Sequence, residues 1–379
     1  MQENHVLCYN FGMQENPEYL TTQLITYLGN KRRLIFEIEK QVSSIKKRLD
    51  KEKCVCADLF SGSGIVSRML KQHSSCLIAN DIEDYAMILN SCYLSDKSDF
   101  DENYYDFLRN NIEESFKSSS YEGIITRNYA PKDDNHIQAG ERVFYTHTNA
   151  MRIDTYRKLI DDCIQKDDFK KFFLAPLIVE SSVHTNTSGV FKGFYKDRKT
   201  GTGCFGGNGK NALSRIMGSI ELKKPVLSNF ECDCRIFQKD AVALSKELSD
   251  IDIAYLDPPY NQHPYGSNYF MLNLIVKNEI TAPMSNVSGI VSGWNRSVFN
   301  RRQTAVLALE EIIKSLDSNF IIISYNSEGF IAFDTMLQIL QKYGKYETIE
   351  IKYNTFRGSR NLKERNIHVT EFLFILEKK

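Results

Sequence analysis

The sequence lacks the features of a membrane, secreted or disulfide-linked protein. No stretch of its 379 residues approaches the roughly 18 apolar residues of a membrane-spanning helix, and the polar N-terminus lacks the apolar core of a signal peptide. The nine cysteines are scattered and pair only as C-x-C, at Cys54 with Cys56 and at Cys232 with Cys234. Alternate positions of a buried strand explain such pairs better than a zinc site does. We therefore expect a cytoplasmic protein with reduced thiols and no metal.

The chain also lacks net charge, since 48 Lys and Arg residues balance 48 Asp and Glu residues. Neutrality argues against a histone-like binder but conceals a local excess: between Lys192 and Lys224 there are eight basic residues and two acidic ones. A second basic cluster consists of Arg357, Arg360, Lys363 and Arg365. A solvated loop would explain the first cluster, whereas two basic patches on a neutral protein indicate a polyanion bound to one face.

The order of the apolar segments predicts an α/β fold in about two folding units. The expected strands are 54–60, 76–80, 232–237, 251–256, 319–325, 347–353 and 370–377, with helices after the first two at 61–72 and 83–94. From about residue 95 to 224 the sequence is more polar, with helical spacing at 150–165 and a Gly-rich loop. We therefore predict a catalytic domain, 1–95 and 225–379, interrupted by a mostly helical, loop-rich module at 96–224.

The turn after the first strand is rich in glycine. In "DLFSGSG" the strand ends near Phe60, and the chain turns through Gly62 and Gly64 into a helix, at the sheet edge where α/β proteins bind nucleosides. A plain strand–helix turn would also use this pattern, and Ser67 stands where a third fingerprint glycine would be. At the end of the next strand, Asp81 is placed to accept hydrogen bonds from ribose hydroxyls. Together these features indicate an adenosine-containing cofactor, either a nicotinamide dinucleotide or S-adenosylmethionine.

The segment "IDIAYLDPPY" ends an apolar strand on Asp257 and then stiffens the chain with Pro258 and Pro259. An exocyclic amino group on an aromatic base is a poor nucleophile, because its lone pair is delocalised into the ring. The Asp257 carboxylate and the Pro258 carbonyl are two acceptors that would draw this nitrogen toward tetrahedral geometry. The Tyr260 ring offers a face for a planar base. An ordinary Asp-Pro turn would not explain this aromatic residue or the paired nucleoside site.

The chain resembles the type II N6-adenine-specific DNA methyltransferases, the DNA adenine methylase family. The similar motifs are "TYLGNKRRL" (26–34), "DLFSGSG" (58–64), "NDIEDYA" (80–86), "FQKDAVAL" (237–244), "DPPY" (257–260) and "FRGSRNLKERNIHVTEFLFIL" (356–376). They occur in family order, and the likeness is weakest at roughly 96–140. The resemblance implies a Rossmann-like S-adenosylmethionine-dependent methyltransferase sheet with helices on both faces, interrupted by a DNA-recognition module.

The resemblance also implies roles for the residues around S-adenosylmethionine. Tyr27, Gly29 and Lys31 would lie beside its methionine part, Asp58, Phe60, Gly62 and Gly64 would line its body, Asp81 and Ile82 would contact its ribose and adenine, and Asp240 would contact its adenine amino group. From the residues alone, Lys31 could equally be a surface lysine of a helix-start turn. Asp240 could equally be a helix N-cap.

An adenine inside double-stranded DNA is stacked and cannot meet a buried cofactor, so it must be flipped out at a cost of about a few kcal/mol. Phosphate contacts offset this cost. We assign DNA contact to residues 184–196 and 206–215, where the candidate backbone or base contacts are Lys192, Lys196, Lys210 and Arg215. Tyr265 and Tyr269 either insert near the flipped base or serve in packing.

The sequence thus predicts a site-specific DNA adenine N6-methyltransferase, the modification component of a restriction–modification system. One rival acts on cytosine N4 or on RNA adenine, and Asp257 disfavours cytosine because family members acting on cytosine tend to carry serine there. A second rival is a catalytically silent DNA-binding regulator, which would not need an intact "DPPY". A nicotinamide dehydrogenase is disfavoured by the missing third glycine. The target sequence, a monomeric state and a cognate restriction endonuclease stay open.

Overall fold

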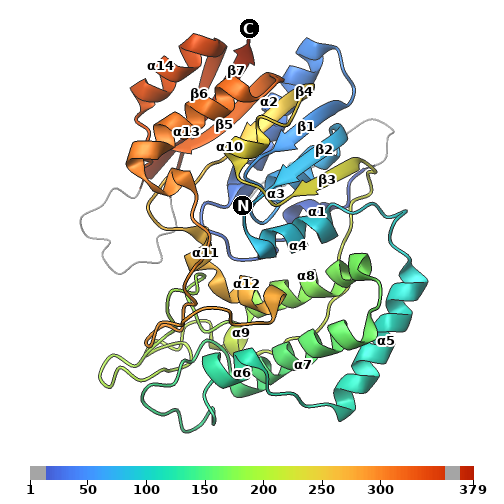
Figure 1. The fold of residues 1–379 in the computed structure, drawn as a ribbon, viewed down its shortest axis with the longest axis vertical. Coiled ribbons are helices and arrows are strands. Elements are labelled where there is room, and N and C mark those ends of the chain that lie inside the picture. Colours follow the sequence, from blue (N-terminus) through green and yellow to red (C-terminus); the bar gives the residue numbers. More distant parts are fainter. Residues whose placement is uncertain (1–13, 355–367) are drawn as a thin grey trace, which may run out of the picture.

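The computed structural model describes residues 14–354 and 368–379, and a seven-stranded sheet lies in the upper half of the molecule in Figure 1. The strands are β1 (Cys54–Asp58), β2 (Ser74–Asn80), β3 (Asp233–Phe237), β4 (Ile251–Leu256), β5 (Ser318–Asn326), β6 (Gly344–Asn354) and β7 (His368–Lys378). Their order across the sheet is β3-β2-β1-β4-β5-β7-β6. Neighbouring strands are parallel from β3 to β5, whereas β7 runs antiparallel to β5 and β6. The strand order reverses between β1 and β4, where open α/β sheets bind ligands.

Helices cover both faces of the sheet, as predicted. The helices are α1 (Pro17–Thr21), α2 (Ile35–Leu49), α3 (Ile65–Lys71), α4 (Asp84–Tyr93), α5 (Glu102–Ser118), α6 (Ile124–Tyr129), α7 (His147–Cys163), α8 (Asp167–Val183), α9 (Leu213–Met217), α10 (Ala241–Leu244), α11 (Tyr265–Asn268), α12 (Phe270–Lys277), α13 (Arg302–Ser315) and α14 (Phe333–Tyr343), with 3-10 turns η1 (Lys31–Arg33) and η2 (Val298–Asn300). Side chains of α2 and α3 pack on one face, and those of α10, α13 and α14 on the other.

β4 shows why the strands could be found in the sequence. All six of its residues are buried, so an apolar run with one acidic residue, Asp252, marks it. Ala254 and Leu256 point into one core, and Ile253 and Tyr255 point into the other. The strand therefore needs apolar residues at every position except where Asp252 is paired.

A helical lobe lies below the sheet in Figure 1, and we define it as residues 96–224 together with α12. Its core is one cluster of buried side chains from α4, α5, α7, α8 and α12. α4 follows β2 directly, yet it packs against α8, and α12 packs against both helices. The predicted domain division at residues 95 and 224 stays a prediction, but a single apolar core crosses it.

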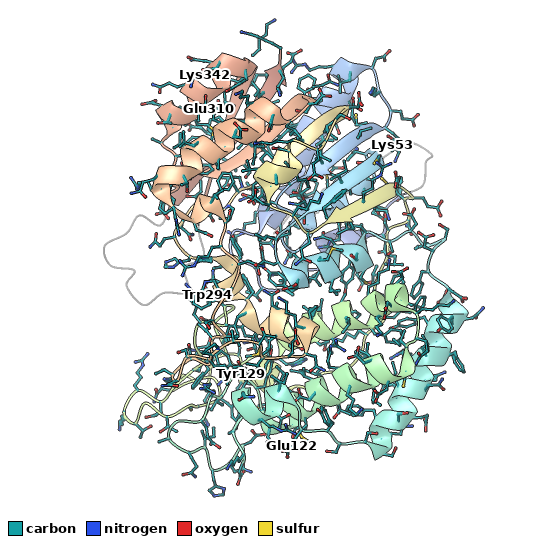
Figure 2. The ribbon with its side chains drawn as sticks, viewed as in Figure 1. Lys53, Glu122, Tyr129, Trp294, Glu310 and Lys342 are labelled. Atoms are coloured by element: carbon teal, nitrogen blue, oxygen red, sulfur yellow. The ribbon has the colours of Figure 1, made fainter. Side chains whose placement is uncertain are left out.

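The chain re-enters the helical lobe after β4. The Tyr129 hydroxyl donates to the Gly289 carbonyl at 2.7 Å, and Arg142 donates to the Ser285 carbonyl at 3.2 Å. Figure 2 shows Tyr129 within the helical lobe and Trp294 nearer its junction with the sheet. The segment that follows α12 is therefore built into the same lobe as the inserted residues.

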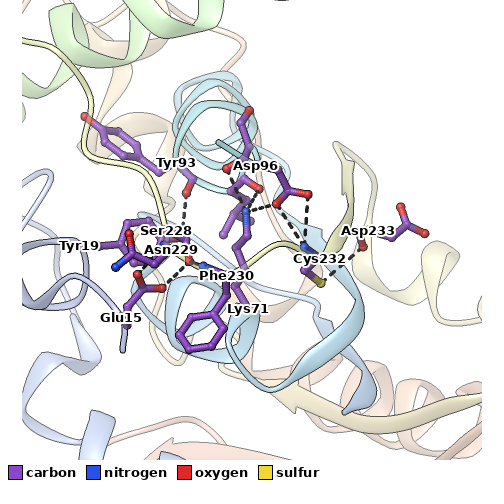
Figure 3. A network of polar contacts seen from close by, with 12 residues as sticks. Glu15, Tyr19, Lys71, Tyr93, Asp96, Ser228, Asn229, Phe230, Cys232 and Asp233 are labelled. Carbon is purple, nitrogen blue, oxygen red and sulfur yellow. Dashed lines mark hydrogen bonds and ion pairs between the residues drawn. The ribbon is translucent and has the colours of Figure 1, made fainter. Parts of the chain in front are cut away.

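A polar network joins the ends of the inserted segment to the sheet (Figure 3). The buried Lys71 ammonium pairs with Asp96 at 2.6 Å, and the Asp96 carboxylate accepts from the Cys232 backbone N–H at 3.2 Å. The Glu15 carboxylate accepts from the Ser228 hydroxyl. These contacts fasten the chain where it leaves and rejoins the sheet.

Three of the four cysteines in the C-x-C pairs occupy strand positions, and Cys232 lies one residue before β3. Cys54 and Cys56 are fully buried on β1, and Cys234 lies on β3. Within residues 14–354 and 368–379, no group of three His, Cys, Asp or Glu side chains is arranged to hold a metal. In the same ranges, no helix has the length and apolar character needed to cross a membrane. The basic cluster expected at Arg357, Arg360, Lys363 and Arg365 lies outside the described residues.

Candidate active site

The carboxyl ends of β1, β2 and β4 open into one cavity. The predicted residues that line it are Tyr27, Phe60, Asp81, Ile82, Asp240, Asp257 and Pro259. A smaller neighbouring cavity is lined by Gly29, Lys31 and Asp58 and shares Tyr27, Phe60 and Asp257 with the first. Parallel strands bring their carboxyl ends to one edge, which is why residues far apart in the sequence meet here.

The loop after β1 requires glycine at two positions. Gly62 has a φ of +52° and Gly64 a φ of +79°, the left-handed conformation that side chains disfavour. A Cβ on Gly62 would lie 2.8 Å from the Tyr27 ring, and one on Gly64 would lie 2.6 Å from Asn90 Oδ1. Asn90, which the sequence analysis did not single out, donates to the Gly62 carbonyl at 3.3 Å. The loop is therefore held tightly between the Tyr27 ring and α4.

Asp81 braces this loop from the neighbouring strand. Its Oδ2 accepts from the Gly62 N–H and its Oδ1 from the Glu83 N–H, both at 2.9 Å. Burial raises the pKa of Asp81 to about 6, although the two amides act to lower it. Asp81 thus has a structural task in addition to its place in the cavity lining.

The cavity suits an adenosine-containing cofactor. Phe60 and Ile82 line it with apolar surface for a planar base, and Asp81 and Asp240 bring acceptors for hydroxyl and amino groups. Gly62 lacks the side chain that would fill the space between the loop and Tyr27. Apolar faces and a few acceptors around a glycine turn are what a nucleoside requires.

Asp240 also caps a helix. Its Oδ1 accepts from the Val242 and Ala243 N–H groups, each at 3.0 Å, at the start of α10. The N-cap interpretation is therefore correct, while contact with the cofactor stays a prediction.

Asp58 lines the smaller cavity and is almost fully buried. Its carboxylate is 1% exposed and accepts from the Ser67 hydroxyl at 2.6 Å. Burial raises the pKa of Asp58 to about 7, with the nearby Asp257 also raising it. Ser67, which stands in place of the third fingerprint glycine, thus satisfies a buried carboxylate.

Asp257 lies one residue beyond β4 and faces a buried lysine. Lys31 Nζ is 3.0 Å from Asp257 Oδ1, and Lys31 is only 4% exposed, so the surface-lysine interpretation is wrong. Burial raises the pKa of Asp257 to about 6, against the lowering effect of Lys31 and with a further raising effect from Glu371. At neutral pH the Asp257 carboxylate is therefore ionised and can act as an acceptor. The Tyr260 ring lies 5.9 Å from the Lys31 ammonium.

Three tyrosines stack beside this motif. The Tyr27 ring lies 5.0 Å from that of Tyr265 and 5.1 Å from that of Tyr269. The Tyr265 hydroxyl donates to the Leu28 carbonyl at 2.9 Å, and the Leu28 N–H donates to the Tyr269 hydroxyl at 2.8 Å. Tyr269 is fully buried and serves in packing, whereas Tyr265 lines the cavity.

Three of the four basic residues predicted to contact DNA are exposed on loops of the helical lobe: Lys192, Lys196 and Lys210. Lys192 Nζ lies 3.2 Å from His263 Nδ1, and the Phe191 N–H donates to the Asn268 carbonyl at 2.7 Å. The Lys192 loop is therefore attached to the segment that follows "DPPY", next to the cavity.

Arg215 is placed differently. It is half-buried, and its guanidinium donates to the Val183 carbonyl and, at 3.3 Å, to the Thr187 carbonyl. Burial lowers its pKa. These two bonds tie the Arg215 guanidinium to the segment that leads to Lys192.

Glu371 was not among the predicted site residues, although its sequence context carries a signal. A carboxylate inside the apolar run "TEFLFIL" is costly to bury unless it is paired. Glu371 is 1% exposed on β7, and its Oε1 lies 2.9 Å from Lys31 Nζ. Glu83, also missed, lines the cavity and accepts from Asn273 Nδ2 at 2.6 Å, while burial raises its pKa to about 8.

The fold and the cavity define a class. The sheet is mostly parallel, with the antiparallel strand β7 inserted between β5 and β6, and a nucleoside-type cavity lies at the carboxyl ends of its strands. This arrangement is the Rossmann-like fold of S-adenosylmethionine-dependent methyltransferases. The family model for D12 class N6 adenine-specific DNA methyltransferases matches residues 27–339, and the chain belongs to that family. The resemblance predicted from the motifs is confirmed, and with it the enzyme class and the cofactor, S-adenosylmethionine.

Two curated relatives match along nearly their whole length. The type II methyltransferase M.NlaIII of Neisseria lactamica is 30% identical over 365 residues, which cover 93% of this chain and 99% of that protein. The type II methyltransferase M.CviAII of Paramecium bursaria Chlorella virus 1 is 29% identical over 362 residues, covering 93% and 98%. A solved precorrin-6y C5,15-methyltransferase from Geobacter metallireducens is 9% identical, with coverage of 90% and 89% and a TM-score of 0.28, too low to carry an argument.

Proposed function

We propose that the chain methylates the N6 amino group of a flipped-out adenine at a specific site in double-stranded DNA. One observation carries the proposal: Asp257 and Pro259 of "DPPY" line the same cavity as Asp81 and as Phe60, which precedes the glycine turn. Family membership supports the base and the nucleic acid. The type II relatives support a role as the modification component of a restriction–modification system.

The residues of "DPPY" prepare the amino group for attack. Asp257, ionised at neutral pH, accepts from one N–H of the amino group, and the Pro258 carbonyl accepts from the other. Pro258 and Pro259 hold that carbonyl in a fixed direction, so little reorganisation is needed. The Tyr260 ring stacks on the base. S-adenosylmethionine, when bound, supplies an electrophilic methyl group.

The cofactor would be held by the residues that surround the two cavities. We assign this role to Tyr27, Gly29, Lys31, Asp58, Phe60, Gly62, Gly64, Asp81, Ile82 and Asp240. Within this set, Asp81 and Gly62 act together, because the carboxylate already binds the Gly62 amide. A change at Asp81 would therefore disturb both the ribose contact and the shape of the loop.

DNA would bind across the helical lobe beside the cavity. Lys192, Lys196 and Lys210 are the exposed cations that would contact phosphates or bases, and they offset the cost of flipping the adenine. Arg215 would support them from beneath the loop.

The chain would act as a monomer in the cytoplasm. A single chain supplies the cofactor cavity, "DPPY" and the basic loops, so that catalysis needs no second copy. In the cytoplasm, a cognate restriction endonuclease would share the target site. Light scattering of the protein alone and with DNA measures the oligomeric state, and a stable dimer would contradict the monomer.

The test is methyl transfer from labelled S-adenosylmethionine to duplex DNA of mixed sequence, followed by digestion to nucleosides. We expect the label in N6-methyladenine. Label in N4-methylcytosine, or transfer to RNA alone, would overturn the assigned base or nucleic acid. If the protein binds S-adenosylmethionine but transfers no methyl group, the proposal that it is catalytic is overturned.

A further inference from the structure

A buried charge cluster extends from Asp257 to β7. Lys31 Nζ lies 3.0 Å from Asp257 Oδ1 and 2.9 Å from Glu371 Oε1. The Lys31 and Glu371 side chains are 5% and 1% exposed, and that of Asp257 is 19% exposed. The cluster therefore runs from the edge of the cavity into the protein, with Glu371 at its inner end.

Glu371 is held in place by neutral donors as well as by Lys31. The Ser324 hydroxyl donates to its Oε1 at 2.7 Å, and Asn326 Nδ2 donates to its Oε2 at 3.4 Å. Both donors lie on β5, which pairs with β7. Two strands of the sheet thus hold this carboxylate, and the carboxylate in turn holds the Lys31 ammonium. A buried ion cluster is seldom the most stable solution for a strand, since apolar residues of similar volume often serve as well.

The cluster has one positive and two negative charges. Burial by itself would lower the pKa of Lys31, but Asp257 and Glu371 raise it well above its ordinary value. The ammonium therefore stays charged, and it is divided between two carboxylates. If Glu371 were neutral, the whole charge of Lys31 would act on Asp257 and make that carboxylate a weaker acceptor.

We propose that Glu371 is a positioning residue for methyl transfer: it holds the Lys31 ammonium against Oδ1 of Asp257 and leaves Oδ2 to accept from the substrate amino group. The inference rests on the proposed function, because it explains how the acceptor in "DPPY" is oriented. Glu371 touches neither the base nor the cofactor and acts through Lys31.

Other ionisable groups also surround Asp257, and a pH profile reports on all of them. They are Lys31, Glu371, Asp58, Tyr255 and Tyr265. Glu371 is the one whose charge can be removed with least change of shape, by Glu371→Gln. The substitution removes a charge that raises the pKa of Asp257.

The experiment measures the single-turnover rate of N6-methyladenine formation against pH for the wild type and Glu371→Gln. We expect the plateau rate to fall by about tenfold to a hundredfold. We also expect the acidic limb of the profile of rate against pH, where the rate falls as the pH drops, to move to lower pH. The dissociation constants for S-adenosylmethionine and DNA should change by less than about threefold. If Glu371→Gln changes neither the plateau rate nor the pH at which the rate falls, the proposal is overturned.

A double-mutant comparison separates positioning from a general structural defect. In a background of Asp257→Asn, Glu371→Gln should slow the residual reaction by less than about twofold, because the group it acts through is already disabled. Additive losses would overturn the proposal.

Asp252→Asn is the matched control. It neutralises another buried carboxylate that is paired with a lysine, at the opposite end of β4. We expect the acidic limb of this control to stay in place, and the same shift as in Glu371→Gln would overturn the proposal.

If Glu371→Gln does not fold, Glu371→Asp decides the question, since it keeps the charge and draws the carboxylate back by about one methylene. A lower plateau with an unmoved acidic limb supports positioning, and an unchanged plateau overturns it. The wild type serves as the test of function in the same assay. Without N6-methyladenine from the wild type the proposed function fails, whereas a normal wild type beside an unaffected Glu371→Gln refutes this inference alone.

Discussion

Asp252 and Asp257 lie at the two ends of β4, and both carboxylates face a lysine. At the amino end, Asp252 accepts from Lys51 Nζ at 2.7 Å, from the Val55 N–H at 2.9 Å and from Asn319 Nδ2 at 3.2 Å. These donors come from three segments, so the Asp252 carboxylate joins strands of the sheet.

At the carboxyl end, Asp257 has Lys31 as its partner, and Lys31 is shared with Glu371. Burial raises the pKa of Asp257 to about 6. The two ends of one strand therefore hold carboxylates with different tasks, one buried and one at the edge of the cavity. The one surrounded by donors serves structure, whereas the one that shares a single cation keeps acceptor capacity toward the cavity.

The strongest test of this contrast is Asp257→Ala. We expect the single-turnover rate to fall by more than about a hundredfold, because an acceptor aimed at the reacting nitrogen is lost. Affinity for S-adenosylmethionine and DNA should stay within about threefold of the wild type. Loss of folding, seen by circular dichroism, would instead assign Asp257 a structural task like that of Asp252.

Asp252→Asn probes the other end of β4. We expect a loss of about 1–3 kcal/mol in the free energy of unfolding, because strong charged hydrogen bonds are weakened. Urea titration measures this loss, and the methylation rate at saturating substrate should not change. If the methylation rate falls strongly while the free energy of unfolding stays the same, Asp252 and Asp257 do not have different tasks.

Asp81→Ala extends the comparison to β2. The carboxylate braces Gly62, so we expect the dissociation constant for S-adenosylmethionine to rise by about tenfold, equivalent to about 1.4 kcal/mol. Isothermal titration calorimetry measures it, with Asp81→Asn expected in between. An unchanged constant would exclude Asp81 from the cofactor site.

The pH dependence of the wild type follows from the pKa of Asp257. Its ionised form is the acceptor, so the rate should fall as the pH drops through about 6, by about tenfold for each further pH unit. Single-turnover rates across about pH 5 to about pH 9 measure this limb. A flat profile down to about pH 5 would show that Asp257 ionises as an ordinary exposed aspartate does.

Lys192→Ala should give the smallest effect. Removal of one phosphate contact is expected to reduce the slope of log affinity against log salt by about 1. Lys342→Ala is the control, because Lys342 pairs with Glu310 at 2.8 Å at the far end of the molecule in Figure 2. If the two variants have equal slopes, DNA contact lies elsewhere.

Much of the sheet could be predicted because its signals are local. The bounds predicted for β4, 251–256, are those of the structure, since this fully buried strand is apolar except at the paired Asp252, and Asp257 follows its last residue. α7 was also found from its spacing, with ends within a few residues. α8 was missed: it is apolar around most of its surface and contains Pro176, so it shows neither a clear polar face nor an uninterrupted helical pattern.

Within the site, too, residues with a local sequence signal were predicted and residues that depend on distant segments were not. The glycine loop, Asp81 and "DPPY" were found because each follows a strand with its own apolar signal. Lys31 was placed near the cofactor, but its partner Glu371 was not, since Lys31 lies in η1 and Glu371 on β7, and only the folded chain brings these two segments together. Arg215 was predicted to contact DNA together with Lys192, Lys196 and Lys210, and nothing in its sequence neighbours shows that two carbonyl groups bind it.

The sequence by itself determined the strands, the turn glycines, the acceptor motif and the family, because these depend on residues close together along the chain. Only the tertiary structure decided that Lys31 joins Asp257 to Glu371, that Arg215 supports a loop, and that α12 shares the apolar core of the inserted helices. Ion pairs and shared cores depend on which distant segments meet. That choice is made by the free energy of packing the whole chain, to which local patterns contribute only a part.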